Sequence, residues 1–388
     1  MSKPLISKIV ESVPPSGIRR FFDIILSMEG VISLGVGEPD FATPWTIRET
    51  GIYSLEQGYT TYTSNQGLLK LREAISNHLY HTYGLNYDPM EEILITVGVS
   101  EALDLALRAI INPGDEVIIP EPSYVSYKPC TLFSGGIPVV VPTYLKDGFK
   151  VTSSEIEKVV TDRTKVILLS YPNNPTGATM DREGLLEIAE VAKRHDLVVI
   201  SDEIYGQLTY DDTYTPFPSI PNMKERTIFL DGFSKAYAMT GWRIGFACSI
   251  PEVIRAMTKI HQYTTLCASI IAQKAAIEAI TKGNDRMYEM KNEYNRRRQL
   301  IVNGLREIGL PCFEPKGAFY AFPSIENTRL SSSEFAERLL LEEKVAVVPG
   351  EVFGRCGEGY IRCSYAVEQQ LIEEALTRMD RFVKRYRK

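Results

Sequence analysis

One lysine of this 388-residue chain stands in an unusual setting, within the stretch DGFSKAYAMTGWRIGF at residues 231–246. Lys235 follows the apolar run TIFLD (227–231) and precedes the apolar run IGFAC (244–248), and both runs are typical of buried strands. Lysine is seldom buried without a partner. A lysine held between two core strands is therefore either a paired structural charge or a chemical group, such as an amine nucleophile.

Polar and aromatic residues follow other apolar runs in a pattern that fits one chemistry. Asp202 and Tyr205 follow one Val/Ile-rich run, and Asn174 follows another. A lysine, a carboxylate and an aromatic ring can together hold pyridoxal 5′-phosphate (PLP), because the lysine forms a Schiff base with its aldehyde. We expect Asp202 to bond the ring nitrogen, which makes the ring an electron sink. Tyr205 and Asn174 would bond the ring hydroxyl oxygen, and Tyr124 would stack on the ring.

The phosphate of such a cofactor needs hydrogen-bond donors and positive charge. Gly98, Val99 and Ser100 lie between a strand-like run and a helix-like segment. Their amides and the Ser100 hydroxyl can converge on an anion at a helix N-terminus. Arg243 is the expected guanidinium partner, and Ser234 offers a further hydroxyl.

Each of these residues also has an ordinary structural explanation. Ser100 by itself is more often a simple helix N-cap, and Asn174 in PNNPTG is more often a turn residue. Asp202 by itself could end a strand at the surface, and the two tyrosines could be core or rim aromatics. Their joint order along the chain favours the cofactor site.

Seven short apolar runs between residues 93 and 248 must position these side chains. Helix-like segments such as 100–110 and 181–196 separate them. Continuous apolar strands that alternate with amphipathic helices predict an α/β fold with a mostly parallel, seven-stranded sheet between helices. Such sheets bind ligands at the carboxyl ends of their strands, where the polar residues are found. The runs are ILIT (93–96), EVIIP (116–120), PVVVP (138–142), VILLS (166–170), LVVIS (197–201), TIFLD (227–231) and IGFAC (244–248).

The pattern changes after about residue 285, which predicts a second, smaller α+β domain. A long charged helix comes first and a helix near 368–386 comes last. The strand-like segments between them are GAFYAFP (317–323), VAVVPG (345–350) and YIRCSYA (360–366). The predicted parts are an N-terminal arm with part of the small domain (1–46), a large cofactor-binding domain (47–284) and the small C-terminal domain (285–388).

Composition disfavours several other classes of protein. A net charge of −6 gives no broad cationic surface for nucleic acid, and the RRR at 296–298 is interpreted as a solvated helix face. The six cysteines form no CxxC pair, so we expect reduced cysteines and no metal site. The chain shows no signal-peptide core and no apolar run of the roughly 20 residues that a membrane span needs. These features predict a soluble, cytoplasmic protein without nucleic-acid or membrane partners.

Eight motifs, in order along the chain, resemble those of the fold-type I, class I/II PLP-dependent aminotransferases, the group of the aspartate and aromatic aminotransferases. The resemblance implies that Lys235 is the Schiff-base lysine and proton shuttle, that Asp202 is the ring-nitrogen partner, and that Asn174 and Tyr205 bond the ring oxygen. The motifs are GVGEPDF (35–41), YTSNQGLLKLREAI (62–75), TVGVSEAL (96–103), YPNNPTG (171–177), SDEIYGQLTYD (201–211), FSKAYAMTGWRIGF (233–246), KGAFYAFP (316–323) and GEGYIRCSYA (357–366).

The resemblance also implies residues that local chemistry does not reveal. Arg362 is similar to the arginine that grips the substrate α-carboxylate with two donors, with Asn174 and the Gly37 backbone nearby. Tyr62 resembles a tyrosine that reaches the phosphate of the neighbouring subunit, so we expect a C2 homodimer with shared active sites. Gly232 stands where many relatives carry serine or threonine, which predicts a phosphate cup with one side-chain ligand fewer.

The implied reaction is a ping-pong transamination between an L-amino acid and a 2-oxo acid. Residues 18–22 (IRRFF) offer cations and aromatic rings to the substrate side chain. We expect aspartate or aromatic amino acids as donors and 2-oxoglutarate as the acceptor. A PLP-dependent β-lyase acting on a cystathionine-like substrate is the alternative, because it would use the same lysine and aspartate. A non-enzymatic sensor is disfavoured, because 388 residues leave little room for an attached DNA-binding segment.

Overall fold

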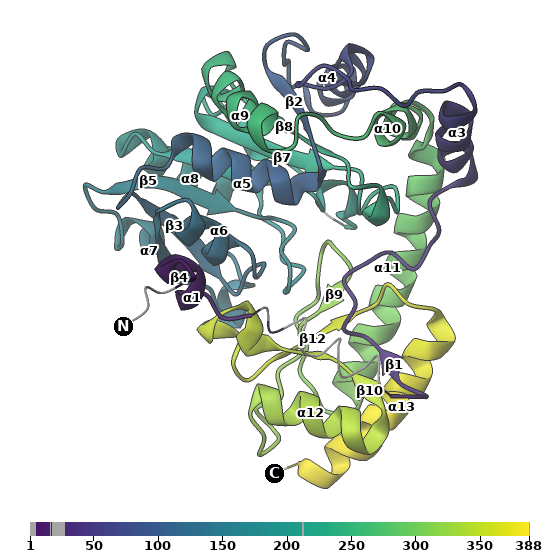
Figure 1. Cartoon of the computed structure of the whole chain (residues 1–388). Coiled ribbons are helices and arrows are strands. Elements are labelled where there is room, and N and C mark those ends of the chain that lie inside the picture. Colours follow the sequence, from purple (N-terminus) through teal and green to yellow (C-terminus); the bar gives the residue numbers. More distant parts are fainter. Residues whose placement is uncertain (1–4, 16, 18–27, 212, 388) are drawn as a thin grey trace.

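A seven-stranded sheet lies at the centre of the larger part of the molecule (Figure 1). The structure is a computed structural model that describes residues 5–15, 17, 28–211 and 213–387. The strand order is β2-β8-β7-β6-β5-β3-β4, and within this sheet β8 runs antiparallel to both of its neighbours. All seven predicted strands form, as β2 (Ile93–Thr96), β3 (Glu116–Glu121), β4 (Ile137–Pro142), β5 (Thr164–Leu169), β6 (Val198–Asp202), β7 (Thr227–Gly232) and β8 (Gly245–Cys248).

Helices cover both faces of this sheet, which explains why its strands are apolar throughout. In β5, Val166 and Leu168 pack into one core cluster, whereas Ile167 and Leu169 pack into another on the opposite face. The helices of this part are α3 (Trp45–Glu56), α4 (Leu69–Tyr83), α5 (Gly98–Ile110), α6 (Tyr127–Phe133), α7 (Ser153–Glu157), α8 (Arg182–Arg194), α9 (Pro251–Thr264) and α10 (Ile270–Lys282).

In the residues that the structure describes, the smaller part combines two small sheets with three long helices. One sheet has the antiparallel order β11-β12-β9, and the other pairs β1 with β10 in parallel. In Figure 1, α11 runs from beside α10 to the smaller part, where it packs against α13. The elements are β1 (Ile32–Ser33), β9 (Tyr320–Ala321), β10 (Val345–Ala346), β11 (Val348–Pro349), β12 (Ile361–Ser364), α11 (Asn284–Glu307), α12 (Ser332–Glu343) and α13 (Gln369–Tyr386). A short helix, α1 (Lys8–Ser12), lies near the N-terminus.

We propose to keep the division into parts 1–46, 47–284 and 285–388. Ile32 and Leu34 belong to a core cluster composed mainly of residues beyond position 290, which supports grouping the N-terminal segment with the smaller part. The second boundary falls at the start of α11, the helix that connects the two parts.

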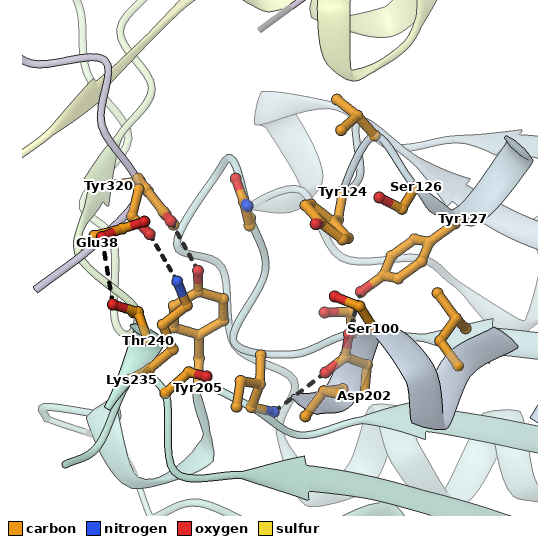
Figure 2. Close-up of a pocket in the computed structure, with 18 of the residues that line it drawn as sticks. Glu38, Ser100, Tyr124, Ser126, Tyr127, Asp202, Tyr205, Lys235, Thr240 and Tyr320 are labelled. Atoms are coloured by element: carbon orange, nitrogen blue, oxygen red, sulfur yellow. Dashed lines mark hydrogen bonds between the residues drawn. The ribbon is translucent and has the colours of Figure 1, made fainter. Parts of the chain in front are cut away.

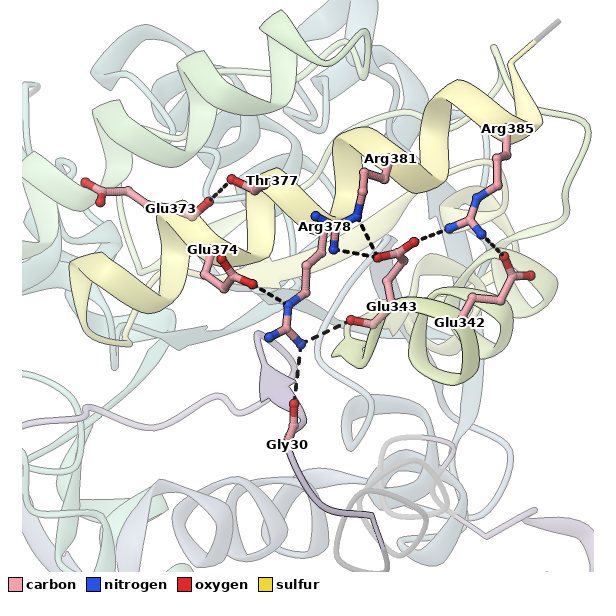
Figure 3. Close-up of polar contacts among 9 residues, drawn as sticks. All are labelled: Gly30, Glu342, Glu343, Glu373, Glu374, Thr377, Arg378, Arg381 and Arg385. Atoms are coloured by element: carbon pink, nitrogen blue, oxygen red, sulfur yellow. Dashed lines mark hydrogen bonds and ion pairs between the residues drawn. The ribbon is translucent and has the colours of Figure 1, made fainter.

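A network of ion pairs joins α12 and α13 (Figure 3). The Glu343 carboxylate accepts hydrogen bonds from Arg381, at 2.9 Å, and from Arg385. Arg378 donates to the backbone carbonyls of Glu343 and Gly30, at 3.2 and 3.4 Å. Exposed ion pairs contribute at most about 1 kcal/mol each. Their effect is therefore mainly to fix α13 against the end of α12 and the segment that leads into β1.

The arginines of α11 correct one expectation, since only Arg296 of the three is exposed. The side chains of Arg297 and Arg298 are 7% and 2% exposed. Arg297 pairs with Asp40 at 2.8 Å, and Arg298 pairs with Asp211 at 2.6 Å. The interpretation of this run as a solvated face was wrong for two residues, because loops from elsewhere in the chain bring carboxylates against the helix.

No helix in the described ranges combines the length and the apolar character that crossing a membrane requires.

Candidate active site

A cavity of about 730 Å³ lies at the carboxyl ends of the parallel strands and is closed on one side by residues of the smaller part. Among the residues that line it are Asp202 at the end of β6, Lys235 just after β7, and Tyr320 and Arg362 from the smaller part. Most of the predicted site residues meet here. They are Gly37, Val99, Ser100, Tyr124, Asn174, Asp202, Tyr205, Ser234, Lys235, Arg243 and Arg362.

Lys235 points into this cavity and contacts a carbonyl oxygen (Figure 2). Its Nζ donates to the Gly37 carbonyl at 2.7 Å. The same atom lies 5.9 Å from the ring centroid of Tyr205 and 5.7 Å from that of Phe319. Because its hydrogen-bond partner is neutral, the contacts do not support a paired structural charge.

The surroundings of Lys235 favour the uncharged amine. Burial lowers the pKa of Lys235 to about 8. Glu38 acts to raise this pKa, whereas the guanidinium groups of Arg362 and Arg243 lower it. At neutral pH an amine with this pKa is uncharged more often than an ordinary lysine, as a nucleophile or a base requires.

Asp202 is a buried carboxylate that accepts hydrogen bonds from two donors (Figure 2). The Tyr127 hydroxyl donates to its Oδ2 at 2.8 Å, and the Ile204 amide donates to its Oδ1 at 3.3 Å. Burial raises the pKa of Asp202 to about 6, while these hydrogen bonds and Lys235 act to lower it. The carboxylate is thus mainly ionised at neutral pH and keeps free lone pairs on the cavity side. Tyr127 was not predicted, although it stands three residues after Tyr124.

Tyr205 is joined to a second tyrosine that the sequence did not single out. The hydroxyl oxygens of Tyr205 and Tyr320 lie 2.7 Å apart, and their rings meet edge to face with centroids 5.8 Å apart. Tyr320 belongs to the motif KGAFYAFP, which offered a signal without indicating a function.

Arg362 is a buried cation with unused donor capacity. Its side chain is 2% exposed, and it donates to Asn174 Oδ1 at 2.9 Å and to the Gly35 carbonyl at 2.7 Å. The guanidinium carbon lies 4.4 Å from the ring centroid of Tyr320 and 4.9 Å from that of Phe353. Its Nε has no hydrogen-bond partner. A buried guanidinium held only by neutral groups, with a donor to spare, is a suitable site for a carboxylate.

The N-terminus of α5 and Arg243 contribute to the lining of the cavity. The helix begins at Gly98, so Ser100 is its third residue instead of its first. Gly98 has a φ of +76°, and a Cβ there would lie 2.6 Å from the Arg243 guanidinium. The guanidinium therefore rests against the backbone of the turn, where only glycine fits. Arg243 also donates to the Thr240 carbonyl at 3.1 Å, and its side chain is exposed.

Close backbone packing explains the absence of a hydroxyl at position 232. A Cβ on Gly232 would lie 3.0 Å from the Cα of Gly245 and 3.1 Å from Cγ2 of Val99. A Cβ on Gly245 would lie 2.8 Å from the Val99 nitrogen. Serine or threonine at 232 therefore does not fit without a shift of its neighbours, whereas Ser234 is buried and lines the cavity.

The remaining predicted residues differ in their placement. Tyr124 lines the cavity, and its ring meets that of Tyr127 edge to face at 5.6 Å. Tyr62 does not line the cavity of its own chain and is 81% exposed, on the loop that follows α3. Residues 18–22 lie outside the described residues.

The donor set of the cavity fits PLP. The Lys235 amine, the buried carboxylate of Asp202 and the helix N-terminus with Arg243 suit its aldehyde, its ring nitrogen and its phosphate, respectively. The Arg243 guanidinium, which rests against the backbone of Gly98, and the free Nε of Arg362 offer donors to the two anionic groups that such a site must hold. Within the described parts of the chain, no group of three or more His, Cys, Asp or Glu side chains is arranged to hold a metal ion.

Known proteins match this chain along its whole length. The family model "Aminotransferase class I and II" matches residues 29–379. The aspartate aminotransferase of Pyrococcus abyssi is 45% identical, over 97% of each chain. The aromatic-amino-acid aminotransferase 2 of Thermococcus litoralis is 44% identical, over 98% of each chain. The structure of aspartate aminotransferase from Thermus thermophilus with maleate has a TM-score of 0.94 at 37% identity, covering 98% of this chain and 100% of that one.

These relatives are aminotransferases by name, which does not favour the β-lyase alternative. The chain therefore belongs to the class I and II aminotransferases and is a PLP-dependent aminotransferase.

Proposed function

We propose that this enzyme transfers the amino group of L-aspartate or of an aromatic L-amino acid to a 2-oxo acid, with 2-oxoglutarate as the acceptor. The observation that carries the proposal is that a partly buried amine, Lys235, and a buried guanidinium, Arg362, face one cavity. Every amino acid and its 2-oxo acid share an α carbon, on which the Lys235 amine would act, and an α-carboxylate, which Arg362 would bind. The names of two relatives, an aspartate and an aromatic-amino-acid aminotransferase, support the choice of side chain.

Lys235 is proposed as the group that moves the proton. PLP, when bound, supplies an aldehyde that carries the amino group and a ring that takes up electrons from the substrate α carbon. The Nζ atom, released from the Gly37 carbonyl, would remove the proton from the α carbon and deliver it back in the reverse half-reaction. A pKa of about 8 supports this function, since the amine can both accept and return a proton near neutral pH.

Asp202 is proposed to keep the ring nitrogen protonated, with the Tyr127 hydroxyl fixing its orientation. Tyr205 and Asn174 would bond the ring hydroxyl oxygen, and Tyr124 would cover the ring face. The proposed phosphate donors are Gly98, Val99, Ser100, Ser234 and Arg243.

Arg362 is proposed to bind the α-carboxylate of donor and acceptor alike. Asn174 and the Gly35 carbonyl hold the guanidinium in place, and the rings of Tyr320 and Phe353 confine it. The Gly37 backbone lies close by, because a Cβ on Gly37 would be 3.7 Å from an Arg362 nitrogen. Substrates would thus be fixed at the end that they share.

A homodimer with shared active sites is the proposed assembly, and Tyr62 would complete the phosphate site of the partner subunit. Large apolar side chains on and near α3 are exposed, which supports a protein interface. Trp45, Tyr53 and Leu55 are 56%, 56% and 54% exposed, and Tyr62 is 81% exposed. We also propose a cytoplasmic location, which the six free cysteines support.

A substrate panel tests the reaction. We expect L-aspartate or an aromatic amino acid to yield more than one equivalent of its 2-oxo acid per active site only when 2-oxoglutarate is present, because repeated turnover needs an acceptor for the amino group. Product formation is measured with and without 2-oxoglutarate for aspartate, phenylalanine, tyrosine and cystathionine. Pyruvate and ammonia released from cystathionine without an acceptor would instead identify a β-lyase.

Lys235→Ala tests the proton transfer. We expect turnover to fall by about 10³-fold or more, because general acid–base catalysis supplies a factor of this size. The fold and the non-covalent binding of PLP should remain, as measured by circular dichroism and fluorescence. Lys146→Ala, a change at an exposed lysine, is the matched control and should leave turnover unchanged. Substantial transamination by Lys235→Ala without an added amine would rule out the assignment.

Arg362→Lys tests recognition of the shared carboxylate. We expect kcat/KM to fall about tenfold or more for every amino-acid and 2-oxo-acid substrate, because a point charge cannot replace the two-donor fork. Arg296→Lys, at an exposed arginine, serves as the control. Steady-state kinetics with aspartate, an aromatic amino acid and 2-oxoglutarate provide the measurement. An effect limited to one side chain would show that Arg362 recognises something else.

Subunit mixing tests the shared sites. A heterodimer of one Lys235→Ala chain and one Tyr62→Ala chain has one site with both changes and one site with neither. We therefore expect mixing of two weak variants to restore up to about half of the wild-type activity per dimer.

In the control, each variant dimer is cross-linked before the two are mixed, so that subunits cannot exchange. The activity of this mixture should remain low. Proven heterodimers that gain no activity would mean that Tyr62 serves its own subunit.

A further inference from the structure

A buried carboxylate in the first turn of α5 lies directly behind the proposed phosphate site. Glu101 follows Ser100 in the sequence, and its side chain is 13% exposed. Its Oε2 accepts a hydrogen bond from the Val97 amide at 2.5 Å. Its Oε1 accepts from the Thr265 hydroxyl at 2.6 Å and lies 2.9 Å from His261 Nδ1.

The protonation of this cluster follows from its contacts. Burial acts to raise the pKa of Glu101, but hydrogen bonds from His261, Thr265 and Val97 outweigh it, and the pKa lies below its ordinary value. An ionised carboxylate can only accept, so His261 must donate through Nδ1. Its Nε2 is buried and has no partner. The hydrogen bond from the buried imidazole of His261 to Glu101 thus serves to hold one carboxylate in place.

The carboxylate fixes the turn that carries the phosphate donors. Val97 immediately precedes α5, and its amide has no partner within the helix. By accepting this N–H, Glu101 ties the start of the turn to the body of the helix, and the amides of Val99 and Ser100 lie between the two tied points. His261 and Thr265 lie at the end of α9 and fix Glu101 from outside the helix.

The same end of α9 is also bonded to the loop that carries Tyr62. Asn65 Nδ2 donates to the Leu266 carbonyl at 2.8 Å. The segment 261–266 therefore connects the start of α5 with the loop that carries Tyr62.

We propose that Glu101, held by His261 and Thr265, is a positioning residue for the cofactor phosphate. It aligns the Val99 and Ser100 amides and itself does not touch the cofactor. This inference rests on the proposed phosphate site.

Two effects of Glu101 on a bound dianion oppose each other. Its negative charge repels the phosphate, whereas its hydrogen bonds align the amides that attract it. The three hydrogen bonds stabilise the carboxylate and fix its place, and we expect this alignment to outweigh the repulsion. Removal of the carboxylate should therefore weaken, not strengthen, phosphate binding.

Glu101→Gln tests this by comparing PLP with pyridoxal, which lacks the phosphate. We expect the Kd for PLP to rise about tenfold, as for the loss of a hydrogen bond to a charged group. The Kd for pyridoxal should stay within about twofold, because the effect acts through the phosphate alone. Both constants come from fluorescence titration of the cofactor-free protein, and the ³¹P NMR signal of bound PLP should shift. Thr265→Val, which removes one donor only, should change the PLP affinity in the same direction and by less.

Glu116→Gln is the matched control. Glu116 is a buried carboxylate that accepts from Thr161, Thr164 and Arg163, at the opposite end of the sheet from the cavity. It should leave both affinities unchanged, and circular dichroism should show that all variants are folded.

The inference is wrong if Glu101→Gln leaves the PLP affinity unchanged, tightens it, or weakens PLP and pyridoxal by the same factor. Wild-type protein that binds PLP no more tightly than pyridoxal would instead overturn the phosphate site on which the inference rests.

Discussion

Lys235 and Arg362 bring two cations into one cavity, and their hydrogen bonds go to carbonyl and amide oxygens instead of carboxylates. Burying charge without a counterion is costly, so the oxygens that receive these donors must be held firmly. The carbonyls of Gly35 and Gly37 come from one segment, which Arg297 anchors at Asp40 from α11. The helix α11 thus helps to hold a short stretch of backbone against two charges. The positive field that remains suits anionic substrates and an anionic cofactor.

The fold could be predicted because the strands of the large sheet, apart from the edge strand β4, are largely buried on both faces and are therefore rich in apolar residues. The burial of two α11 arginines could not be predicted, because their partners are distant in sequence. Arg297 pairs with Asp40 across 257 residues, and Arg298 pairs with Asp211 across 87 residues. A helical pattern shows which residues share a face but not which distant loop packs against it. The start of α5 was placed two residues late for a related reason. Gly98 adopts a left-handed conformation against Arg243, a contact that local propensity does not reveal.

In the site, the sequence indicated residues with a chemical function of their own. It did not indicate the residues that form hydrogen bonds to them. Lys235 and Asp202 stand in segments whose composition indicates chemistry, whereas Arg362 was predicted from the family resemblance alone. Tyr127 and Tyr320 bond Asp202 and Tyr205 across 75 and 115 residues of sequence, and each looks like an ordinary core aromatic in its own segment. The function of their hydroxyls cannot be inferred until the hydrogen-bond partner is known, because every buried hydroxyl needs a partner, in a functional site or elsewhere.

The close packing of Gly98, Gly232 and Gly245 constrains how this phosphate cup could be re-engineered. A hydroxyl at position 232 would first meet a valine methyl group and the backbone of β8. A shorter side chain at Val99 relieves only the methyl contact, and the strand would still have to move by a few tenths of an ångström. Substitution of one of these glycines alone is therefore expected to create a steric clash. A library that varies positions 99, 232 and 245 together would include phosphate-site variants that cannot be obtained by single substitutions made one after another.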